Sequence, residues 1–485
     1  MNWFIRILAA AVWCSLLHSA FADSAAQKPN IIVLLGDDIG YGDFGCYGAT
    51  KVKTPAIDKV ASQGLRFTDA HSASAVCTPS RYAMLTGQYA WRNPAGDHIL
   101  PGNAPLSIKV GTVTVPSLLK KAGYKTSAIG KWHLGLADSA PDWNIELKPG
   151  PLEIGFDECF IIPATGDRAP CVYVKDHHVV NLDPKDPITV DYEHSIPGHS
   201  NVIAGIGRIG NMTGGKSALW KDDAIAETLT AQAVQFIERN RNQPFFLYLA
   251  THDIHVPRVP AARFRHASGA GPRGDVIQEF DWTVSEVVKT LDGLNIATNT
   301  LLIVSSDNGG ILDYGDTRER DGDEKSNNGH AFNGPLRGTK GTAYEGGTRI
   351  PLIMRWPAKI KPATSDQLVC LVDTLATCAG ITKQKLPPTS APDSFSLLPI
   401  INGNLNIAVR KSLIEHSRRM GVREGSWKLL TPARRQKGNE LSGAELYDLA
   451  SDIGEKKNLA AENPAKVKEL MTILQRARED GHTRP

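Results

Sequence analysis

The sequence has almost no excess of charge, few cysteines and, after its first residues, no long apolar run. Its 54 Lys and Arg residues nearly balance its 51 Asp and Glu residues, giving a formal net charge of +3. This balance gives no support for a nucleic-acid partner or a charged membrane surface. Seven cysteines in 485 residues are too few for a disulfide scaffold, and no later segment is long and apolar enough to span a membrane. A globular protein remains, with 41% hydrophobic residues, in which any strongly charged site must be local.

The first 22 residues have the pattern of a secretory signal peptide. Arg6 supplies a positive charge, residues 7–17 form an apolar stretch, and residues 20–22 (AFA) have the small-x-small pattern of a cleavage site. The alternative, an uncleaved anchor helix, needs about 20 apolar residues and is disfavoured. We therefore expect residues 1–22 to be removed and the protein to be exported, to the periplasm or outside the cell.

Export would permit disulfides among the six cysteines that remain after cleavage. Short separations make Cys159 with Cys171, and Cys370 with Cys378, candidate pairs. The sequence alone leaves their connectivity open.

Short apolar runs that end in polar or glycine-rich residues predict buried strands. The runs are Asn30–Gly36, Tyr124–Ile129, Phe245–Ala250 and Thr300–Ser306. Helix-compatible segments lie between them, including Val115–Ala122 and Asp223–Asn240. This alternation predicts an α/β fold with a large, mostly parallel sheet sandwiched by helices. Because open α/β sheets bind ligands beyond the carboxyl ends of their strands, the polar residues after these runs are candidate site residues.

The pattern changes near residue 365, so we expect two domains after the signal peptide. Residues 23–364 would form the α/β catalytic domain and residues 365–485 a smaller α+β subdomain. The predicted elements of this subdomain are short strands at Ser412–Glu415, Gly421–Leu430 and Glu445–Leu449 and a final helix at Pro464–Glu479. Residues 166–222, rich in Pro, Gly, His and Asp, show no clear periodicity and predict a long irregular insertion that faces the substrate.

Two pairs of polar residues at strand ends predict a metal site. Asp37 and Asp38 follow one run, and Asp307 and Asn308 follow another. Their hard oxygen donors suit calcium or magnesium, whereas zinc would prefer histidine or cysteine. Taken singly, such a pair is more often a turn or a helix cap, and the repetition in two similar contexts favours the metal.

A third segment predicts an anion site at the start of a helix. Thr78 can cap the helix, Pro79 fits its first position and Gly87 can end it, so Cys77 would lie at the helix start. Free backbone N–H groups and the helix dipole favour an anion there, and Arg81 adds a permanently charged, forked donor one turn later. The alternative, a buried cysteine before a helix, explains Cys77 but not the whole string.

Together these motifs resemble the type I sulfatases of the alkaline phosphatase superfamily. The string CTPSR at residues 77–81, followed by LTG at 85–87, is similar to the signature in which the family's cysteine is oxidised to formylglycine. Four further segments occur in the family's order, at residues 37–43, 130–135, 306–310 and 340–347. The likeness covers nearly the whole mature chain and implies an alkaline-phosphatase-like fold.

The resemblance implies one calcium ion held by Asp37, Asp38, Asp307 and Asn308, with the modified Cys77 also facing it. It also implies a maturation enzyme that generates formylglycine from Cys77. As a hydrated aldehyde, residue 77 would carry two hydroxyls. One attacks the sulfur of a sulfate ester, and the other breaks down the covalent intermediate to release sulfate, a step that a cysteine thiol could not perform.

The resemblance also implies roles for basic residues. Arg81, Lys131 and Lys340 would supply fixed positive charge where the sulfate oxygens gain negative charge. His133 would contact a formylglycine hydroxyl, and an extended chain would place it on the same face as Lys131. For lone residues, a solvated lysine or a structural histidine is the commoner role, and the positions within the motifs favour catalysis.

One more histidine would protonate the leaving oxygen. The family's His-x-Pro pattern after a strand selects His255, in the string HVP at residues 255–257, over His252. The two histidines are only three residues apart, so His252 stays the alternative.

We therefore expect a hydrolase of sulfate esters that acts on a sulfated carbohydrate or an aryl sulfate. Residues 155–158 and 163–173 resemble segments of bacterial polysaccharide sulfatases, with some likeness to enzymes that remove 6-sulfate from galactose or N-acetylgalactosamine. Asp97-His98 and His177-His178 are candidates for recognising a sugar, with ordinary loop residues as the alternative.

Two rival functions stay open. The first is a phosphate or phosphonate ester hydrolase of the same superfamily, because these esters share the shape and charge of sulfate esters. A two-zinc enzyme would need more histidine ligands at the strand ends than this chain offers. The second is an inactive protein that binds sulfated glycans, which would have lost a catalytic residue, and none of the expected residues is missing.

Overall fold

The computed structural model describes residues 28–193, 202–312, 327–432 and 443–484. The predicted signal peptide, residues 1–22, lies outside the described residues. Within them, no helix combines the length and the apolar composition that crossing a membrane requires.

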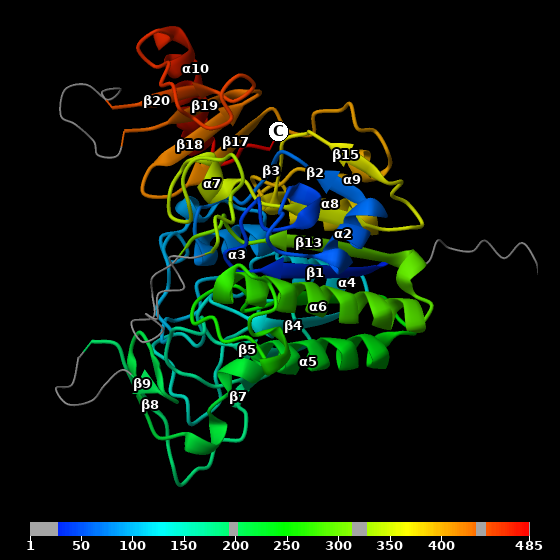
Figure 1. The fold of residues 1–485 in the computed structure, drawn as a ribbon, viewed down its shortest axis with the longest axis vertical. Coiled ribbons are helices and arrows are strands. Elements are labelled where there is room, and N and C mark those ends of the chain that lie inside the picture. The colour runs from blue at the N-terminus through cyan, green and yellow to red at the C-terminus, as the bar shows by residue number, and fades with distance from the viewer. Residues whose placement is uncertain (1–27, 194–201, 313–326, 433–442, 485) are drawn as a thin grey trace, which may run out of the picture.

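A sheet of ten strands forms the centre of the molecule (Figure 1). Its strands run in the order β15, β2, β14, β13, β1, β12, β4, β5, β6 and β7. The five central strands are parallel: β13 (Thr300–Ser306), β1 (Asn30–Gly36), β12 (Phe245–Ala250), β4 (Lys125–Lys131) and β5 (Glu158–Ile162). The strands beyond them are β14 (Leu352–Arg355), β2 (Leu65–Phe67) and β15 (Ala363–Ser365) on one side, and β6 (Val174–Lys175) and β7 (His178–Val179) on the other. Antiparallel pairs join β14 to β13 and β6 to β5, so the predicted mixed, mostly parallel sheet is confirmed.

The apolar runs of the sequence become the central strands. The predicted strands at residues 30–36, 245–250 and 300–306 have the observed bounds, and the run predicted at 124–129 is shifted to Lys125–Lys131. These strands are buried along almost their whole length because helices cover both faces of the sheet.

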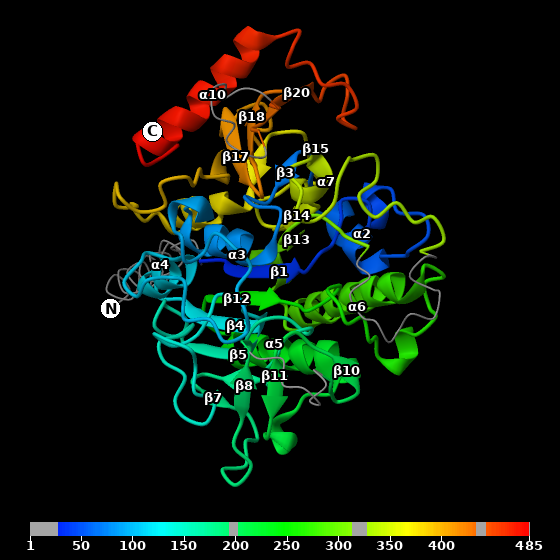
Figure 2. The ribbon, with the colours of Figure 1, turned by 90° about the vertical axis from the view of Figure 1, so that its left-hand side faces the viewer.

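Side chains of β1 alternate between two helical layers. Ile31 and Val33 pack in a core with helices α3 (Cys77–Thr86), α4 (Val115–Lys121) and α8 (Thr374–Thr382). Ile32 and Leu34 pack in a second core with α2 (Pro55–Ser62), α5 (Ile225–Asn240) and α6 (Gly271–Gly293). The helices predicted at 115–122 and 223–240 are α4 and α5. Figure 2 shows the sheet between the two layers.

The smaller C-terminal subdomain is a four-stranded antiparallel sheet with one helix. The strands are β17 (Ser412–His416), β18 (Met420–Glu424), β19 (Trp427–Leu430) and β20 (Glu445–Asp448), and α10 (Pro464–Glu479) packs on β18 and β19. The prediction of a single strand over residues 421–430 is wrong, because the chain reverses at Gly425, whose φ of 57° is the left-handed conformation that glycine adopts readily.

The boundary at residue 364 stays a prediction. The chain just after it still packs on the large domain, since β16 (Val369–Cys370) pairs with β3 (Ala70–His71) and α8 contacts α3 and α4. The new sheet begins only at Ser412.

The predicted insertion at residues 166–222 contains short strands and 3-10 turns in its described part. Besides β6 and β7 of the large sheet, the strands are β8 (Thr189–Asp191) paired with β11 (Asn211–Thr213), and β9 (Val202–Ile203) paired with β10 (Ile206–Gly207). In Figures 1 and 2 this region and α10 lie at opposite ends of the molecule. Short helices complete the fold: α7 (Glu345–Thr348), α9 (Leu398–Ile401) and 3-10 turns at 45–47, 90–92, 216–218, 222–224, 262–264, 297–299 and 371–373.

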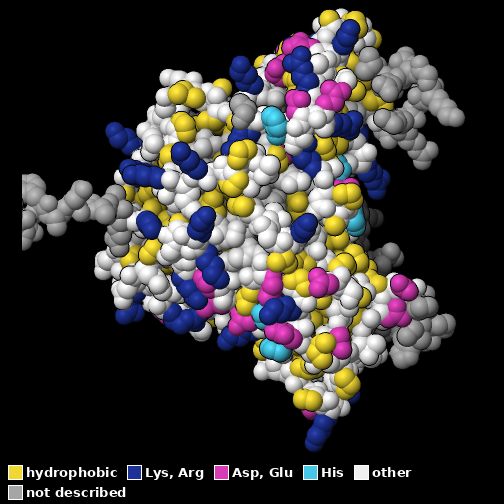
Figure 3. Space-filling view, turned by 180° about the vertical axis from the view of Figure 1, so that it is seen from behind, with side chains coloured by type: hydrophobic (Ala, Val, Ile, Leu, Met, Phe, Trp, Pro, Cys, Tyr) yellow, Lys and Arg dark blue, Asp and Glu magenta, His cyan; other side chains and the backbone are white. Residues whose placement is uncertain are grey.

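The six described cysteines are all free thiols, so neither candidate disulfide is present. Cys159 lies on β5 and its Sγ contacts the Asp176 carbonyl at 3.4 Å, whereas Cys171 faces the Arg168 carbonyl. On the face that Figure 3 shows, basic, acidic and hydrophobic side chains are interspersed.

Candidate active site

The four predicted metal ligands follow two neighbouring strands. Asp37 and Asp38 come directly after β1, and Asp307 and Asn308 come directly after β13. Because β1 and β13 are parallel and paired along their whole length, both pairs leave the sheet at the same carboxyl edge. All four side chains are buried, with at most 1% of their surface exposed. The fold therefore brings the four residues together.

Two oxygen atoms of this group have no hydrogen-bond partner among the described residues: Asp37 Oδ1 and Asn308 Oδ1. The Asn308 amide nitrogen is already used, because it donates to Asp38 Oδ1 at 2.8 Å and to the Gly309 carbonyl at 3.0 Å. A buried oxygen without a donor costs about 1–3 kcal/mol. Hard oxygens left unpaired in this way fit a divalent cation such as calcium or magnesium. The identity of the ion stays a prediction.

The electrostatics of the carboxylates agree with this fit. Burial raises the pKa of Asp37 and of Asp307 above the usual value. Burial also acts on Asp38, but Lys340 and His255 outweigh it and hold the pKa of that carboxyl below its usual range. A divalent cation at this point would stabilise all three ionised forms.

Cys77 is the first residue of α3 and is 1% exposed. Val76 precedes it in extended conformation, with φ of −144°, and makes no side-chain cap. The expected cap by Thr78 is wrong, since its Oγ1 donates instead to the His133 carbonyl at 2.9 Å. The helix ends as predicted at Gly87, which has φ of 66°. The result is a helix start held directly against the segment that carries His133.

His133 lies beside the sulfur of Cys77. Its Nδ1 is 3.3 Å from Cys77 Sγ, and its Nε2 is 2.9 Å from the Leu100 carbonyl. A carbonyl only accepts, so Nε2 carries the ring hydrogen and Nδ1 is free to accept a proton from residue 77. Burial, reinforced by Lys131 and Arg168, lowers the pKa of His133 well below its usual value and keeps the ring neutral.

The expectation that Lys131 and His133 share the face of an extended chain is wrong. His133 has φ of 53°, so the chain bends sharply after β4. The bend turns His133 toward Cys77, while the Lys131 ammonium reaches Asp37 Oδ2. Both side chains still face the same site, through a backbone turn that the spacing did not reveal.

Arg81 is completely buried one helical turn after Cys77. Its Nε and Nη2 lie 2.8 and 2.7 Å from Asp307 Oδ2, and its Nη1 donates to the Lys131 carbonyl at 3.0 Å. The hydroxyl of Tyr248 on β12 lies 3.4 Å from the same Nη1. Tyr248 was not among the site residues predicted from the sequence. Arg81 is therefore held in a fixed position by Asp307 and the Lys131 carbonyl, one helical turn after residue 77.

Lys131 and Lys340 each neutralise one of the paired aspartates. The Lys131 ammonium donates to Asp37 and has no exposed surface. The Lys340 ammonium lies 2.8 Å from Asp38 and is 11% exposed, at the edge of a pocket. One cation is thus enclosed and the other can reach a ligand.

His255 and His252 have different surroundings. His255 Nε2 lies 3.8 Å from Asp38 Oδ2, and its Nδ1 lies 2.8 Å from the Val256 carbonyl, so Nδ1 carries a hydrogen and Nε2 faces the site. Burial lowers the pKa of His255 to about 4 and that of His252 to about 3. The ring of His252 has no hydrogen-bond partner among the described residues and is not part of the pocket lining.

A pocket of 660 Å³ is lined by two of the predicted site residues, His255 and Lys340. Its lining includes His255 and Lys340 from the catalytic edge, Asp167 and Arg168 from the insertion, and His416 and Arg418 from the C-terminal subdomain. The volume is within the range of small-molecule sites, about 300–1,000 Å³.

The sugar-recognition candidates separate. Asp97 lines the pocket, and His98 pairs with it at 2.9 Å on the exposed side. His177 instead contacts Glu153 at 3.0 Å and, like His178, is not part of the lining. The lining residues of the C-terminal hairpin were missed, and the adjacent pair Arg418-Arg419 in a turn between two predicted strands was the available signal.

Comparison with known proteins agrees with this geometry. Residues 29–383 match the family model described as Sulfatase. The chain is 46% identical over 481 residues to an N-acetylgalactosamine-6-O-sulfatase of Bacteroides thetaiotaomicron, covering 93% of each chain. It is 32% identical to human arylsulfatase A, covering 80% of this chain and 70% of the relative. A solved structure from work on the metabolism of multiple glycosaminoglycans by B. thetaiotaomicron has a TM-score of 0.88 and 45% identity, covering 93% of this chain and 99% of that one.

The family match spans well over half of the chain and includes the helix start at Cys77, the strand-end pairs Asp37-Asp38 and Asp307-Asn308, and both lysines. Each motif that suggested the family contributes at least one side chain to the contacts described above. The chain belongs to the sulfatase family and is a sulfuric ester hydrolase.

Proposed function

We propose that this chain removes sulfate from a sulfated glycan, with a 6-sulfated N-acetylgalactosamine as the favoured substrate and 6-sulfated galactose as the alternative. The identity of 46% to an N-acetylgalactosamine-6-O-sulfatase supports the sugar. The observation that carries the reaction is the position of Cys77, which starts a buried helix 3.3 Å from a neutral histidine. One turn later on the same helix, Arg81 pairs with Asp307 at 2.7 Å.

The proposal includes conversion of Cys77 to formylglycine and one calcium ion held by Asp37, Asp38, Asp307 and Asn308. The two unpaired oxygens at Asp37 and Asn308 support this ligand set. When bound, the cation would supply positive charge to the sulfate oxygens and to the modified residue 77.

The side chains around residue 77 have two roles in the proposed reaction: proton transfer and stabilisation of negative charge. His133 Nδ1, with its other nitrogen committed to Leu100, is placed to accept a proton from the hydroxyl of residue 77. Arg81 and Lys131 provide charge that does not move, because both are buried and held by carboxylates.

Lys340 and His255 lie where the sugar must leave. Both line the pocket, and His255 Nε2 faces it, so His255 can donate a proton to the leaving oxygen once it is protonated. An anionic sulfate ester next to the ring favours that protonated form, because a nearby negative charge raises a histidine pKa.

The proposal also covers export, maturation and domain organisation. Cleavage after residue 22 and export to the periplasm or the outside would precede or accompany maturation of Cys77 by a formylglycine-generating enzyme. We also propose residues 23–364 as the catalytic domain and 365–485 as the subdomain.

Two alternatives can be tested against this proposal. Sulfate and phosphonate or phosphate esters are alike in shape, so kcat/KM for matched sulfate and phosphate monoesters separates them. An inactive glycan-binding protein would have lost a catalytic residue, and the sequence retains each of the expected ones.

The central experiment joins mass spectrometry of the peptide containing Cys77 to a substrate screen. Protein from a host with the maturation enzyme is tested on N-acetylgalactosamine 6-sulfate, its 4-sulfate isomer, galactose 6-sulfate, an aryl sulfate and the matched phosphate. We expect an aldehyde at residue 77 and the highest kcat/KM for the 6-sulfated sugars. An unmodified thiol in the native host, or turnover of the aryl ester alone, would contradict the proposal.

A further inference from the structure

Part of the lining of the catalytic pocket comes from the C-terminal subdomain, through the turn between β17 and β18. His416, Ser417 and Arg418 of this turn line the pocket together with Asp167 and Arg168 of the insertion. The turn belongs to the C-terminal sheet, so its side chains can be changed without altering the residues proposed to bind sulfate.

The turn is fixed relative to the nucleophile. The His416 N–H donates to the Ala73 carbonyl and the His416 carbonyl accepts from the Ala75 N–H, both at 2.9 Å. Ala75 is only two residues before Cys77. Ser417 closes the turn, since its N–H donates to the Arg419 carbonyl at 3.1 Å. A side chain on this turn therefore lies at a set distance from residue 77.

Arg418 differs from the other cations of the pocket. Lys340 pairs with Asp38 at 2.8 Å, and Arg168 pairs with Asp167 at 2.7 Å. Among the residues that the structure describes, Arg418 forms no hydrogen bond or ion pair and is exposed. The pocket thus presents one guanidinium whose charge is not compensated.

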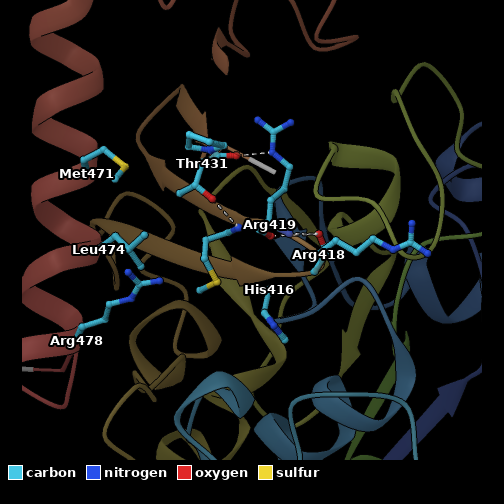
Figure 4. A pocket seen from close by; sticks show the side chains of 10 residues that line it. His416, Arg418, Arg419, Thr431, Met471, Leu474 and Arg478 are labelled. Atoms are coloured by element: carbon cyan, nitrogen blue, oxygen red, sulfur yellow. Dashed lines mark hydrogen bonds between the residues drawn. The ribbon is translucent and has the colours of Figure 1, made fainter. Parts of the chain in front are cut away.

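The neighbouring arginine, Arg419, has hydrogen-bond and ion-pair partners that Arg418 lacks among the described residues. Arg419 donates to the Thr431 carbonyl and pairs with Glu445, both at 2.6 Å, on the side of a smaller hollow of 310 Å³ against α10. Figure 4 shows Arg419 directed to Thr431 and Arg418 extending away from α10, Met471 and Leu474. One arginine of the pair ties the subdomain together, and the other is available to a ligand.

We propose that Arg418 binds an acidic group, a carboxylate or a second sulfate, on the saccharide next to the sulfated one. The proposal rests on the proposed function and adds a specificity-determining residue to it. A guanidinium recognises both kinds of acidic group through forked hydrogen bonds. His416 lies beside it with a buried Nδ1 that has no partner among the described residues, and burial lowers its pKa, so the neutral ring can bond a sugar hydroxyl. The preferred substrate is then an anionic oligosaccharide.

The test compares four substrates: a 6-sulfated disaccharide with a uronic acid neighbour, the same disaccharide with that carboxylate reduced to an alcohol, one with a neutral neighbour that carries a second sulfate, and the 6-sulfated monosaccharide. The wild type should prefer an acidic disaccharide over the reduced one by about tenfold in kcat/KM, mostly through KM. In Arg418→Ala this ratio should fall close to one, and Arg418→Lys should restore part of it. The matched control is Arg476→Ala, which removes an exposed arginine of α10 outside the pocket and should keep the full ratio.

A wild type without preference for either acidic disaccharide, or an Arg418→Ala variant that retains the preference, would overturn the subsite. The preferred acidic disaccharide identifies the group as carboxylate or sulfate. Calorimetry with the Cys77→Ala variant separates this outcome from failure of the proposed function. If no sulfate ester is hydrolysed but the acidic disaccharide binds in an Arg418-dependent way, the subsite stands and the reaction is wrong.

Discussion

The molecule buries two clusters of ionisable side chains that look alike in composition and differ in how their oxygens are paired. The catalytic cluster lies at the carboxyl edge of the sheet, around Asp37, Asp38 and Asn308. The second, here called the seam cluster, lies where the large domain meets the C-terminal sheet. It consists of Asp69, His71, Glu345, Arg349, Glu415, Arg423, Lys428 and Glu455.

In the seam cluster cations occupy the carboxylate oxygens. Lys428 contacts Glu345 at 2.8 Å and both Glu415 and Glu455 at 3.4 Å. His71 lies between Asp69 and Glu415, at 2.8 and 2.7 Å. Although burial opposes it, these carboxylates raise the pKa of His71 and favour the charged ring.

The comparison shows that proximity of acidic groups does not by itself mark a metal site. Asp69, His71 and Glu345 are as close together as Asp37, Asp38 and His255. In both clusters two buried oxygens lack a hydrogen bond, and the difference is what lies near them. Glu415 Oε2 and Glu455 Oε1 of the seam cluster are each 3.4 Å from the Lys428 ammonium. Asp37 Oδ1 is 4.0 Å from the Arg81 guanidinium, and Asn308 Oδ1 has no hydrogen-bond partner among the described residues, which leaves room for a ligand. The seam cluster instead fastens the loop that carries Lys340 and the strand that leads to Cys77 onto the C-terminal sheet.

The largest effect on activity without an effect on stability is expected from Cys77→Ala, at the catalytic cluster. This change removes the precursor of the nucleophile and should lower kcat by at least about a thousandfold, with little change in melting temperature. Turnover of an aryl sulfate and of the best sulfated saccharide measures the effect. Cys378→Ala, which removes another buried free thiol in α8, is the control and should keep turnover. Activity near that of the wild type in Cys77→Ala would refute the assignment.

Calcium should stabilise the protein through one cluster only. After treatment with a chelator, adding calcium should raise the melting temperature of the protein. At a calcium concentration a hundredfold above Kd, the free energy of unfolding should rise by about 2.7 kcal/mol. Asp37→Asn should abolish this increase because it weakens a ligand, whereas Asp69→Asn should lower stability and keep the increase. A full calcium response in Asp37→Asn, or its loss in Asp69→Asn alone, would reverse the roles of the two clusters.

Lys428→Met should break the seam cluster. Removing one cation leaves three buried carboxylates without their shared partner, which should lower the free energy of unfolding by about 3–5 kcal/mol. Urea unfolding measures the loss. Lys466→Met, which breaks an exposed pair with Glu469 on α10, is the matched control and should cost less than about 1 kcal/mol. Equal stability of the two variants would show that the seam pairing contributes little.

The smallest effect concerns pH. Burial, only partly opposed by Lys428, raises the pKa of Glu455 to about 7, above its usual 4.5. The folded state therefore holds this proton more tightly, and the stability that it contributes at acidic pH is lost as the pH rises from about 4.5 to 7. Between pH 5 and 8 the wild type should lose about 2 kcal/mol relative to Glu455→Gln. Parallel pH curves of unfolding free energy for the two proteins would contradict this, and exposed Glu479→Gln should parallel the wild type.

Several elements could be predicted from the sequence because their signals are local. The strands at 30–36, 245–250 and 300–306 are continuous apolar runs, which only a sheet covered on both faces can bury. Asp37, Asp38, Asp307 and Asn308 follow such runs directly, so predicting the strands also predicted where these side chains would meet. The hairpin at 420–430 was misread because its two strands are joined by a turn short enough to look like one strand.

By itself the sequence determined the α/β architecture, the family and the residues gathered at the strand ends, since these depend on apolar runs and on motifs read along the chain. Only the tertiary structure decided the rest: the bend that turns His133 to Cys77, the oxygens left unpaired at Asp37 and Asn308, the pairing of the seam cluster and the position of Arg418. Each of these depends on which distant segments pack together, and hydrogen-bond pairing and charge compensation are settled only when those segments are in contact.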